Sequence, residues 1–120
     1  MDLKLDGKTA LITGASMGIG EHIARTLANE GVHLHLTARS EDKLEILKAQ
    51  ITESSNISVT LHPLDLTSKG ASERLAQMTD NIDILVNNAG AIPSGDLWDV
   101  DETAWRAGFD LKVFGYINMC

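Results

Sequence analysis

Thr13-Gly14-Ala15-Ser16-Met17-Gly18-Ile19-Gly20 joins a short apolar run at residues 9–12 to an apolar-periodic segment, and this junction decides the fold. Its glycines would let a strand turn sharply into a helix, bring the backbone close to a ligand and pack the helix against the strand. The first amides of a helix lack partners within it, and the helix dipole adds positive charge there. We therefore predict a phosphate-binding turn, although the spacing Gly-x-x-x-Gly-x-Gly departs from the commonest dinucleotide fingerprint, Gly-x-Gly-x-x-Gly.

Strand and helix patterns alternate along the rest of the chain. Apolar or alternating runs predict strands at residues 8–12, 32–38, 57–61 and 82–86. Helices are predicted from the glycine loop to Gly31, from the cap residue Ser40, in the segment after residue 70, and from about Asp101. Their expected apolar positions are Ile19, Ile23, Ala24, Leu27 and Ala28 in the first helix, Leu44, Leu47 and Ile51 in the second, and Ala71, Leu75 and Met78 in the third. This alternation predicts an α/β fold with an open, doubly wound parallel sheet.

Composition narrows the class of partner. The chain has 120 residues, enough for one domain, and a formal net charge of -7. Its Lys and Arg residues are scattered, so we expect neither nucleic acid nor an anionic membrane surface as a partner. No apolar run approaches the roughly 20 residues that span a bilayer, and charges interrupt the N-terminal segment. The single cysteine, Cys120, agrees with a reducing compartment, so we expect the cytoplasm.

The last predicted helix has no terminating signal. Its apolar residues recur every three or four positions up to Cys120, where the sequence stops without a cap, glycine or proline. The fourth strand would then have an uncovered edge, which native sheets normally avoid. We therefore expect a fragment of a longer protein, truncated within the helix after the fourth strand; the alternative is a partner chain that completes the sheet.

Three motifs at successive strand–helix turns resemble those of one family. The glycine stretch follows the first strand, Asp65-Leu66 the third, and Asn87-Asn88-Ala89-Gly90 the fourth. Together they resemble the short-chain dehydrogenase/reductase superfamily of NAD(P)-dependent oxidoreductases. The resemblance implies a Rossmann-type sheet of strand order 3-2-1-4, of which residues 1–120 are the N-terminal, cofactor-binding portion.

The resemblance also implies how a dinucleotide is bound. The pyrophosphate would lie over the helix that starts near Met17, contacted by the amides of Gly18 and Ile19 and by the Ser16 hydroxyl. Asp65 would accept a hydrogen bond from the adenine amino group, with the Leu66 backbone beside it. The floor under the ribose and nicotinamide would consist of Asn87, Asn88, Ala89 and Gly90. Gly14 and Gly20 complete the predicted cofactor-binding set.

The choice between NADP and NAD depends on the end of the second strand. An acidic residue there would bind the ribose hydroxyls of NAD, but this chain has Ala38-Arg39-Ser40. The Arg39 guanidinium offers bidentate contact to a 2′-phosphate and Ser40 offers a hydroxyl, so we predict NADP as the cofactor. NAD stays open, because Met17 stands where many NADP-preferring relatives carry a second basic residue.

No catalytic residue is assigned. The resemblance implies general acid catalysis by a Tyr with a Lys four residues later, and a Ser that orients the substrate carbonyl. In this chain the residue four positions after Tyr116 is Cys120. Lys112 precedes Tyr116 by four residues, in the reverse order, and occupies a position where many relatives carry Asn. The resemblance implies hydride exchange between the nicotinamide and a small-molecule carbonyl or secondary alcohol, and a homo-dimer or homo-tetramer. The alternatives are a non-catalytic NAD(P)-binding or scaffold protein and, less favoured because its cofactor lacks a pyrophosphate, a methyltransferase.

Histidines and aromatic residues receive structural interpretations. His33 and His35 share one strand face, but His22 and His62 belong to other predicted elements, so we expect no metal site. The aromatic residues near the C-terminus favour core or subunit contacts over a substrate pocket; they are Trp98, Trp105, Phe109 and Phe114.

Overall fold

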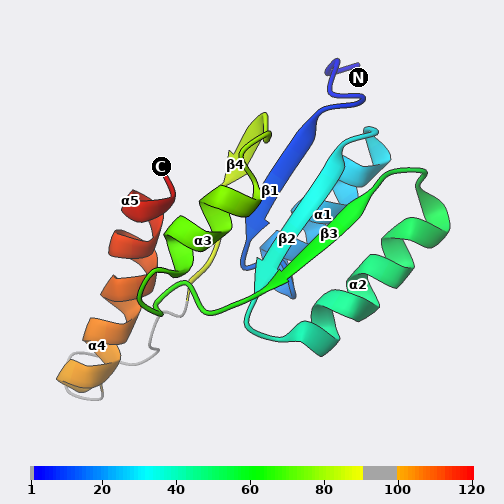
Figure 1. Cartoon of the computed structure of the whole chain (residues 1–120). Coiled ribbons are helices and arrows are strands. Elements are labelled where there is room, and N and C mark those ends of the chain that lie inside the picture. The colour runs from blue at the N-terminus through cyan, green and yellow to red at the C-terminus, as the bar shows by residue number, and fades with distance from the viewer. Residues whose placement is uncertain (1, 91–99) are drawn as a thin grey trace.

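The computed structural model describes residues 2–90 and 100–120, and its centre is a parallel four-stranded sheet in the order β3-β2-β1-β4 (Figure 1). This confirms the predicted doubly wound α/β fold and its strand order. Trp98 lies outside the described residues. The strands are β1 (Thr9–Thr13), β2 (His33–Ala38), β3 (Val59–Pro63) and β4 (Ile84–Val86).

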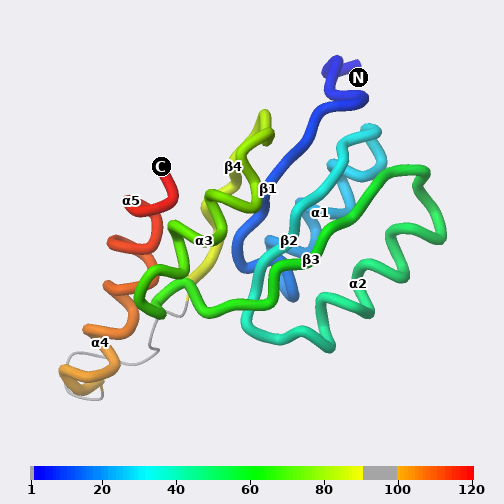
Figure 2. Tube along the Cα trace, in the orientation of Figure 1, coloured from blue at the N-terminus to red at the C-terminus, as the bar shows by residue number. Residues whose placement is uncertain are grey.

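Helices cover both faces of the sheet (Figure 2). The chain steps from β1 through α1 (Gly18–Asn29) to β2 and through α2 (Glu41–Ser54) to β3 in one direction, and then returns through α3 (Ala71–Met78) to β4. Because such crossovers are right-handed, the reversal puts α3 on the opposite face from α1 and α2. The main core lies between the sheet and α1 and α2, and includes Ala10, Ile12, Ala24, Ala28, Leu34, Leu36, Leu44, Leu47 and Ile51.

The third and fourth strands differ from their predicted limits. The third strand was expected at residues 57–61, but pairing with β2 sets its register, with Leu34 opposite Val59 and Ala38 opposite Pro63. The fourth was expected at residues 82–86 and is shorter. Just before β4 begins, the Asp83 carboxylate accepts a hydrogen bond from the Thr9 amide at 2.9 Å. A side chain, rather than a backbone carbonyl of the neighbouring strand, is therefore the acceptor for Thr9. Apolar patterns locate strands, whereas partner strands fix their ends.

Two residues of the expected apolar helix faces, Ile19 and Met78, are exposed rather than buried. Ile19 is 72% exposed, because the buried line of α1 consists of the small residues Gly20, Ala24 and Ala28, which let the helix lie close to the sheet. Met78, in the last turn of α3, is 51% exposed, whereas Ala71 and Leu75 of the same helix are fully buried. Gly31 follows α1 with a positive φ of 81°, as predicted for a residue that ends a helix.

The predicted C-terminal helix has a wider middle section. It consists of α4 (Glu102–Phe109), a π-helical segment η1 (Asp110–Gly115) and α5 (Tyr116–Met119), with Asp101 capping its start through the Ala104 amide at 2.8 Å. Five of its large apolar residues are between 38% and 64% exposed, so these five are not core residues of this chain; they are Trp105, Phe109, Val113, Phe114 and Ile117. Among the described helices, none is both long and apolar enough to cross a membrane.

His35 and His62 form a pair that the sequence did not predict. Their rings stack on neighbouring strands β2 and β3, and His35 Nδ1 lies 2.8 Å from His62 Nε2, so one ring donates a hydrogen bond to the other. Within residues 2–90 and 100–120, no group of three or more His, Cys, Asp or Glu side chains could hold a metal ion. Burial lowers the pKa of both histidines from the ordinary value of 6.5, and the charge of His35 lowers the pKa of His62 further.

We expect this pair to make stability pH-dependent. An unfolded histidine binds a proton near pH 6.5 whereas the folded pair resists it, so the unfolded state binds more protons below that pH. The free energy of unfolding should therefore fall as the pH is lowered from 6.5 toward the lowered pKa values of the pair. Urea titrations of the complete protein between about pH 5 and 8 would measure this, with His62→Gln expected to flatten the dependence. His22→Gln, at an exposed position of α1, is the control, and an unchanged pH dependence in His62→Gln would contradict the prediction.

Candidate cofactor-binding site

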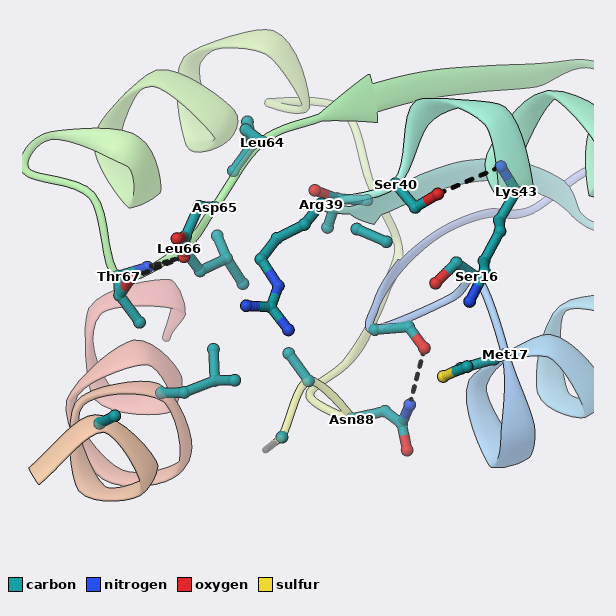
Figure 3. A pocket seen from close by; sticks show the side chains of 17 residues that line it. Ser16, Met17, Arg39, Ser40, Lys43, Leu64, Asp65, Leu66, Thr67 and Asn88 are labelled. Carbon is teal, nitrogen blue, oxygen red and sulfur yellow. Dashed lines mark hydrogen bonds between the residues drawn. The ribbon is translucent and has the colours of Figure 1, made fainter. Parts of the chain in front are cut away.

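A cleft of about 680 Å³ lies along the carboxyl edge of the sheet (Figure 3). It lies over the β1–β4 boundary, where the strand order reverses and ligands of open α/β sheets bind. Most of the predicted cofactor-binding residues line it: Gly14, Ser16, Met17, Arg39, Ser40, Asp65, Leu66, Asn88, Ala89 and Gly90. The four that do not line it are Gly18, Ile19, Gly20 and Asn87.

The three glycines of the loop have three different surroundings. Gly14 has a φ of +65°, and a Cβ there would lie 2.8 Å from the Ala89 Cα. A Cβ at Gly20 would collide with the Gly14 carbonyl and the Asn88 side chain. Gly18 has a φ of +59° and no atom within 4 Å of an added Cβ, so its backbone is open on that side. Gly14 and Gly20 therefore hold the loop against the chain after β4, while Gly18 opens the first turn of α1.

The Thr13 hydroxyl connects this loop to the floor of the cleft. It accepts hydrogen bonds from the amides of Asn88 and Ala89, each at 3.0 Å, and donates to the Val86 carbonyl at 3.3 Å. Thr13 is fully buried, and the Asn88 amide group also donates to the Gly14 carbonyl at 3.2 Å. Sequence patterns assign the Thr13 side chain no role, because its hydrogen-bond partners lie far along the chain.

Asn87 lies beside the cleft and faces the C-terminal helix. Its side-chain nitrogen donates to the Cys120 Sγ at 3.3 Å. Its Oδ1 is buried, and within the described residues it has no hydrogen-bond donor. An unpaired buried carbonyl of this kind costs free energy unless a further group donates to it.

Asp65 is held as a carboxylate at the start of the loop after β3. Its Oδ1 accepts hydrogen bonds from the Thr67 hydroxyl at 2.6 Å and the Thr67 amide at 2.9 Å. These bonds, with a smaller effect from the charge of Arg39, hold the pKa of Asp65 below its ordinary value of 3.8. Among the described residues, none donates a hydrogen bond to Oδ2, which leaves that oxygen for a ligand.

Arg39 and Ser40 lie where β2 passes into α2. The exposed Arg39 side chain extends into the cleft, with Asp65 on one side and Ser40 on the other (Figure 3). The Ser40 Oγ accepts a hydrogen bond from the Lys43 amide at 3.4 Å, as expected of a helix cap. Lys43 lines the same part of the cleft but was not among the predicted binding residues.

The other end of the cleft is formed by Gly90 and the C-terminal helix. Ala107 and Leu111 line it, and a Cβ at Gly90 would collide with the Lys112 side chain, so Lys112 crosses directly over Gly90. The Lys112 ammonium donates to the Tyr116 hydroxyl at 3.2 Å. Lys112 thus forms a contact of the C-terminal helix with the chain after β4.

The strand order and the cleft at its reversal point define a Rossmann-type fold. A family model described as short chain dehydrogenase matches residues 8–120, and the chain therefore belongs to the short chain dehydrogenase family. It is 38% identical over 117 residues to an uncharacterized oxidoreductase of Staphylococcus saprophyticus, covering 94% of this chain and 50% of that protein. The resemblance seen in the motifs is thus confirmed.

Solved structures of similar sequence have a similar fold. An L-sorbose reductase of Gluconobacter frateurii, complexed with NADPH and L-sorbose, has a TM-score of 0.86 and 31% identity over 99% of this chain and 47% of its own. An alcohol dehydrogenase of the archaeon Thermococcus sibiricus, complexed with 5-hydroxy-NADP, has a TM-score of 0.83 and 33% identity over 93% and 49%. The chain spans about half the length of the relatives it matches.

Proposed function

We propose that this chain is the cofactor-binding half of an NADP-preferring oxidoreductase that exchanges hydride with a small-molecule carbonyl or secondary alcohol. The observation that carries the cofactor choice is Arg39 in the cleft at the end of β2, with Ala38 where an NAD-binding acid would stand. The NADPH and 5-hydroxy-NADP complexes of similar proteins support this preference.

The lining of the cleft fits a phosphorylated dinucleotide. Arg39 and Ser40 would bind the 2′-phosphate, and Oδ2 of Asp65 would accept a hydrogen bond from the adenine amino group. The open backbone at Gly18, with Ile19 after it, and the Ser16 hydroxyl would face the pyrophosphate. Ala89 and Gly90 carry little side chain, so they would let the ribose and nicotinamide approach the backbone, with Asn87 and Asn88 beside them. When bound, the cofactor supplies the hydride.

The remaining parts of the proposal concern the complete protein. The groups that move protons to and from the substrate would lie outside these 120 residues. We place the protein in the cytoplasm, as a homo-dimer or homo-tetramer with the exposed apolar face of the C-terminal helix at a subunit contact. Turnover of carbonyl substrates with NADPH by the complete protein, together with none by residues 1–120 alone, would support this; NADPH binding without turnover would favour a non-catalytic NAD(P)-binding protein.

Arg39→Ala tests the cofactor choice. We expect it to weaken NADP binding to the complete protein by about tenfold or more, because a charge-assisted contact to phosphate is lost, and to change NAD binding by less than about twofold. Dissociation constants from nucleotide fluorescence or calorimetry would measure both. Arg106→Ala removes a side chain on α4 that is 76% exposed, is paired with Glu102 and does not line the cleft, and it serves as the control. Equal weakening for the two dinucleotides would show that Arg39 does not bind the 2′-phosphate.

A further inference from the structure

Two cationic side chains enter the α2 end of the cleft from different elements. Arg39 enters it from the end of β2, and Lys43 enters it from the first turn of α2 (Figure 3). The ion pairs of the described residues are Arg25 with Glu21 and Arg106 with Glu102, so neither cleft cation has a carboxylate within 4.0 Å there. Asp65 lies on one side of Arg39 but forms no ion pair with it, so both cations are left open to a ligand.

The position of Lys43 is unfavourable for the helix itself. Ser40 caps α2 and accepts from the Lys43 amide, so Lys43 occupies the third helical position. A capping box would have Glu or Gln there, and the positive end of the helix dipole disfavours a cation in the first turn. Glu41 and Asp42, the two residues before it, follow the rule that Lys43 breaks. A residue that breaks a local rule in a cleft is a candidate for a ligand contact.

Lys43 also extends to the part of the cleft where the glycine loop offers no cation. Met17 lines the cleft with an uncharged side chain that is 58% exposed. The Lys43 side chain extends from α2 toward Ser16, on the far side of Ser40 from Arg39 (Figure 3). A phosphate group between the two cations would therefore meet a guanidinium on one side and an ammonium on the other, with the Ser40 hydroxyl between them.

We infer that Lys43 is a specificity-determining residue that, together with Arg39, binds the 2′-phosphate of NADP; this inference rests on the proposed function. A phosphate monoester carries a charge of about -1.5 to -2 at neutral pH, so one guanidinium neutralises only part of it. NAD has a hydroxyl at the same place and gains little from an ammonium. Lys43 therefore raises the preference for NADP over NAD, and supplies from α2 the second positive charge that Met17 does not supply from the loop.

The test uses ligands that differ by the 2′-phosphate alone and need no turnover. The complete protein is titrated in a calorimeter with adenosine 2′,5′-bisphosphate, with 5′-AMP, and with NADP and NAD. Lys43→Gln is compared with Lys48→Gln, which removes the same charge from the same helix at a position that does not line the cleft. Lys43→Arg keeps the charge. Each titration is repeated at higher salt, because a phosphate contact weakens as salt screens it.

We expect Lys43→Gln to weaken NADP and the bisphosphate by about fivefold to tenfold, and NAD and 5′-AMP by less than about twofold. Lys48→Gln should change none of them, Lys43→Arg should retain the NADP preference, and the salt dependence of bisphosphate binding should be smaller in Lys43→Gln. Equal weakening of both members of each pair would indicate a structural role in α2 and overturn the inference. Unchanged NADP binding in Lys43→Gln, with a loss in Arg39→Ala, would overturn it while leaving the proposed function intact. Binding of neither dinucleotide by the unmutated protein would overturn the proposed function itself.

Discussion

Gly14→Ala is expected to lower the free energy of unfolding of the complete protein by about 2–5 kcal/mol and to abolish measurable NADP binding. Two costs add up at this position. A residue with a Cβ in a left-handed backbone conformation costs about 1–2 kcal/mol. The new methyl group would also lie 2.8 Å from the Ala89 Cα, and overpacking of this kind costs about 1–3 kcal/mol. The chain after β4 must move, and with it the floor of the cleft. Urea unfolding and NADP titration measure the two effects.

Gly7→Ala is the matched control for this variant. Gly7 also has a positive φ, of 80°, but an added Cβ there meets no atom within 4 Å. The control therefore carries the backbone cost without the collision, and NADP binding should be retained. A Gly14→Ala protein as stable as Gly7→Ala would show that the Ala89 segment moves aside freely, contrary to the close packing described here.

Thr13→Val is expected to cost about 2–6 kcal/mol of stability and to weaken NADP binding. Valine has nearly the same shape as threonine, so little packing is lost, but the amides of Asn88 and Ala89 lose their common acceptor. Each buried donor left without a partner costs about 1–3 kcal/mol. Denaturant titration gives the loss in stability, and amide hydrogen exchange should show faster exchange at residues 88 and 89.

Thr13→Ser separates the hydroxyl from the methyl group. Serine keeps the oxygen that accepts both amides, so most of the stability and the slow exchange at residues 88 and 89 should return. If serine were as harmful as valine, the methyl group rather than the hydroxyl would hold the loop, and the hydrogen-bond explanation would be wrong.

Much of the fold could be predicted, because the signals are local. The glycine stretch specifies a strand-to-helix turn, and alternating strand and helix patterns specify a parallel sheet. The exact ends of strands could not be predicted, since pairing with the neighbouring strand β2 sets the limits of β3 at Val59 and Pro63. Ile19 was misplaced because an apolar period does not show that small residues, rather than large ones, face the sheet.

The residues of the cleft also divide into those with a local sequence signal and those placed by tertiary packing. Residues within recognisable motifs were predicted, including Asp65 and Arg39, because their chemistry is readable from type and neighbours. Lys43 was missed because its sequence position assigns it to a helix turn, and only the docking of α2 beside the glycine loop brings it to the cleft. His62 was likewise separated from His35, since strand pairing alone makes them neighbours.

The hydrogen bonds of Thr13 also constrain the order in which the molecule is assembled. The hydroxyl and the Asn88 amide that it accepts are separated by 75 residues, so their contact closes a loop containing most of the chain. Closing a long loop costs chain entropy before the contact's free energy is gained, so such contacts form late on average. The first three strands can pair during synthesis, but the floor of the cleft exists only after β4 has emerged and joined β1. Under the proposed function, nucleotide binding would therefore require this long-range contact to have closed first.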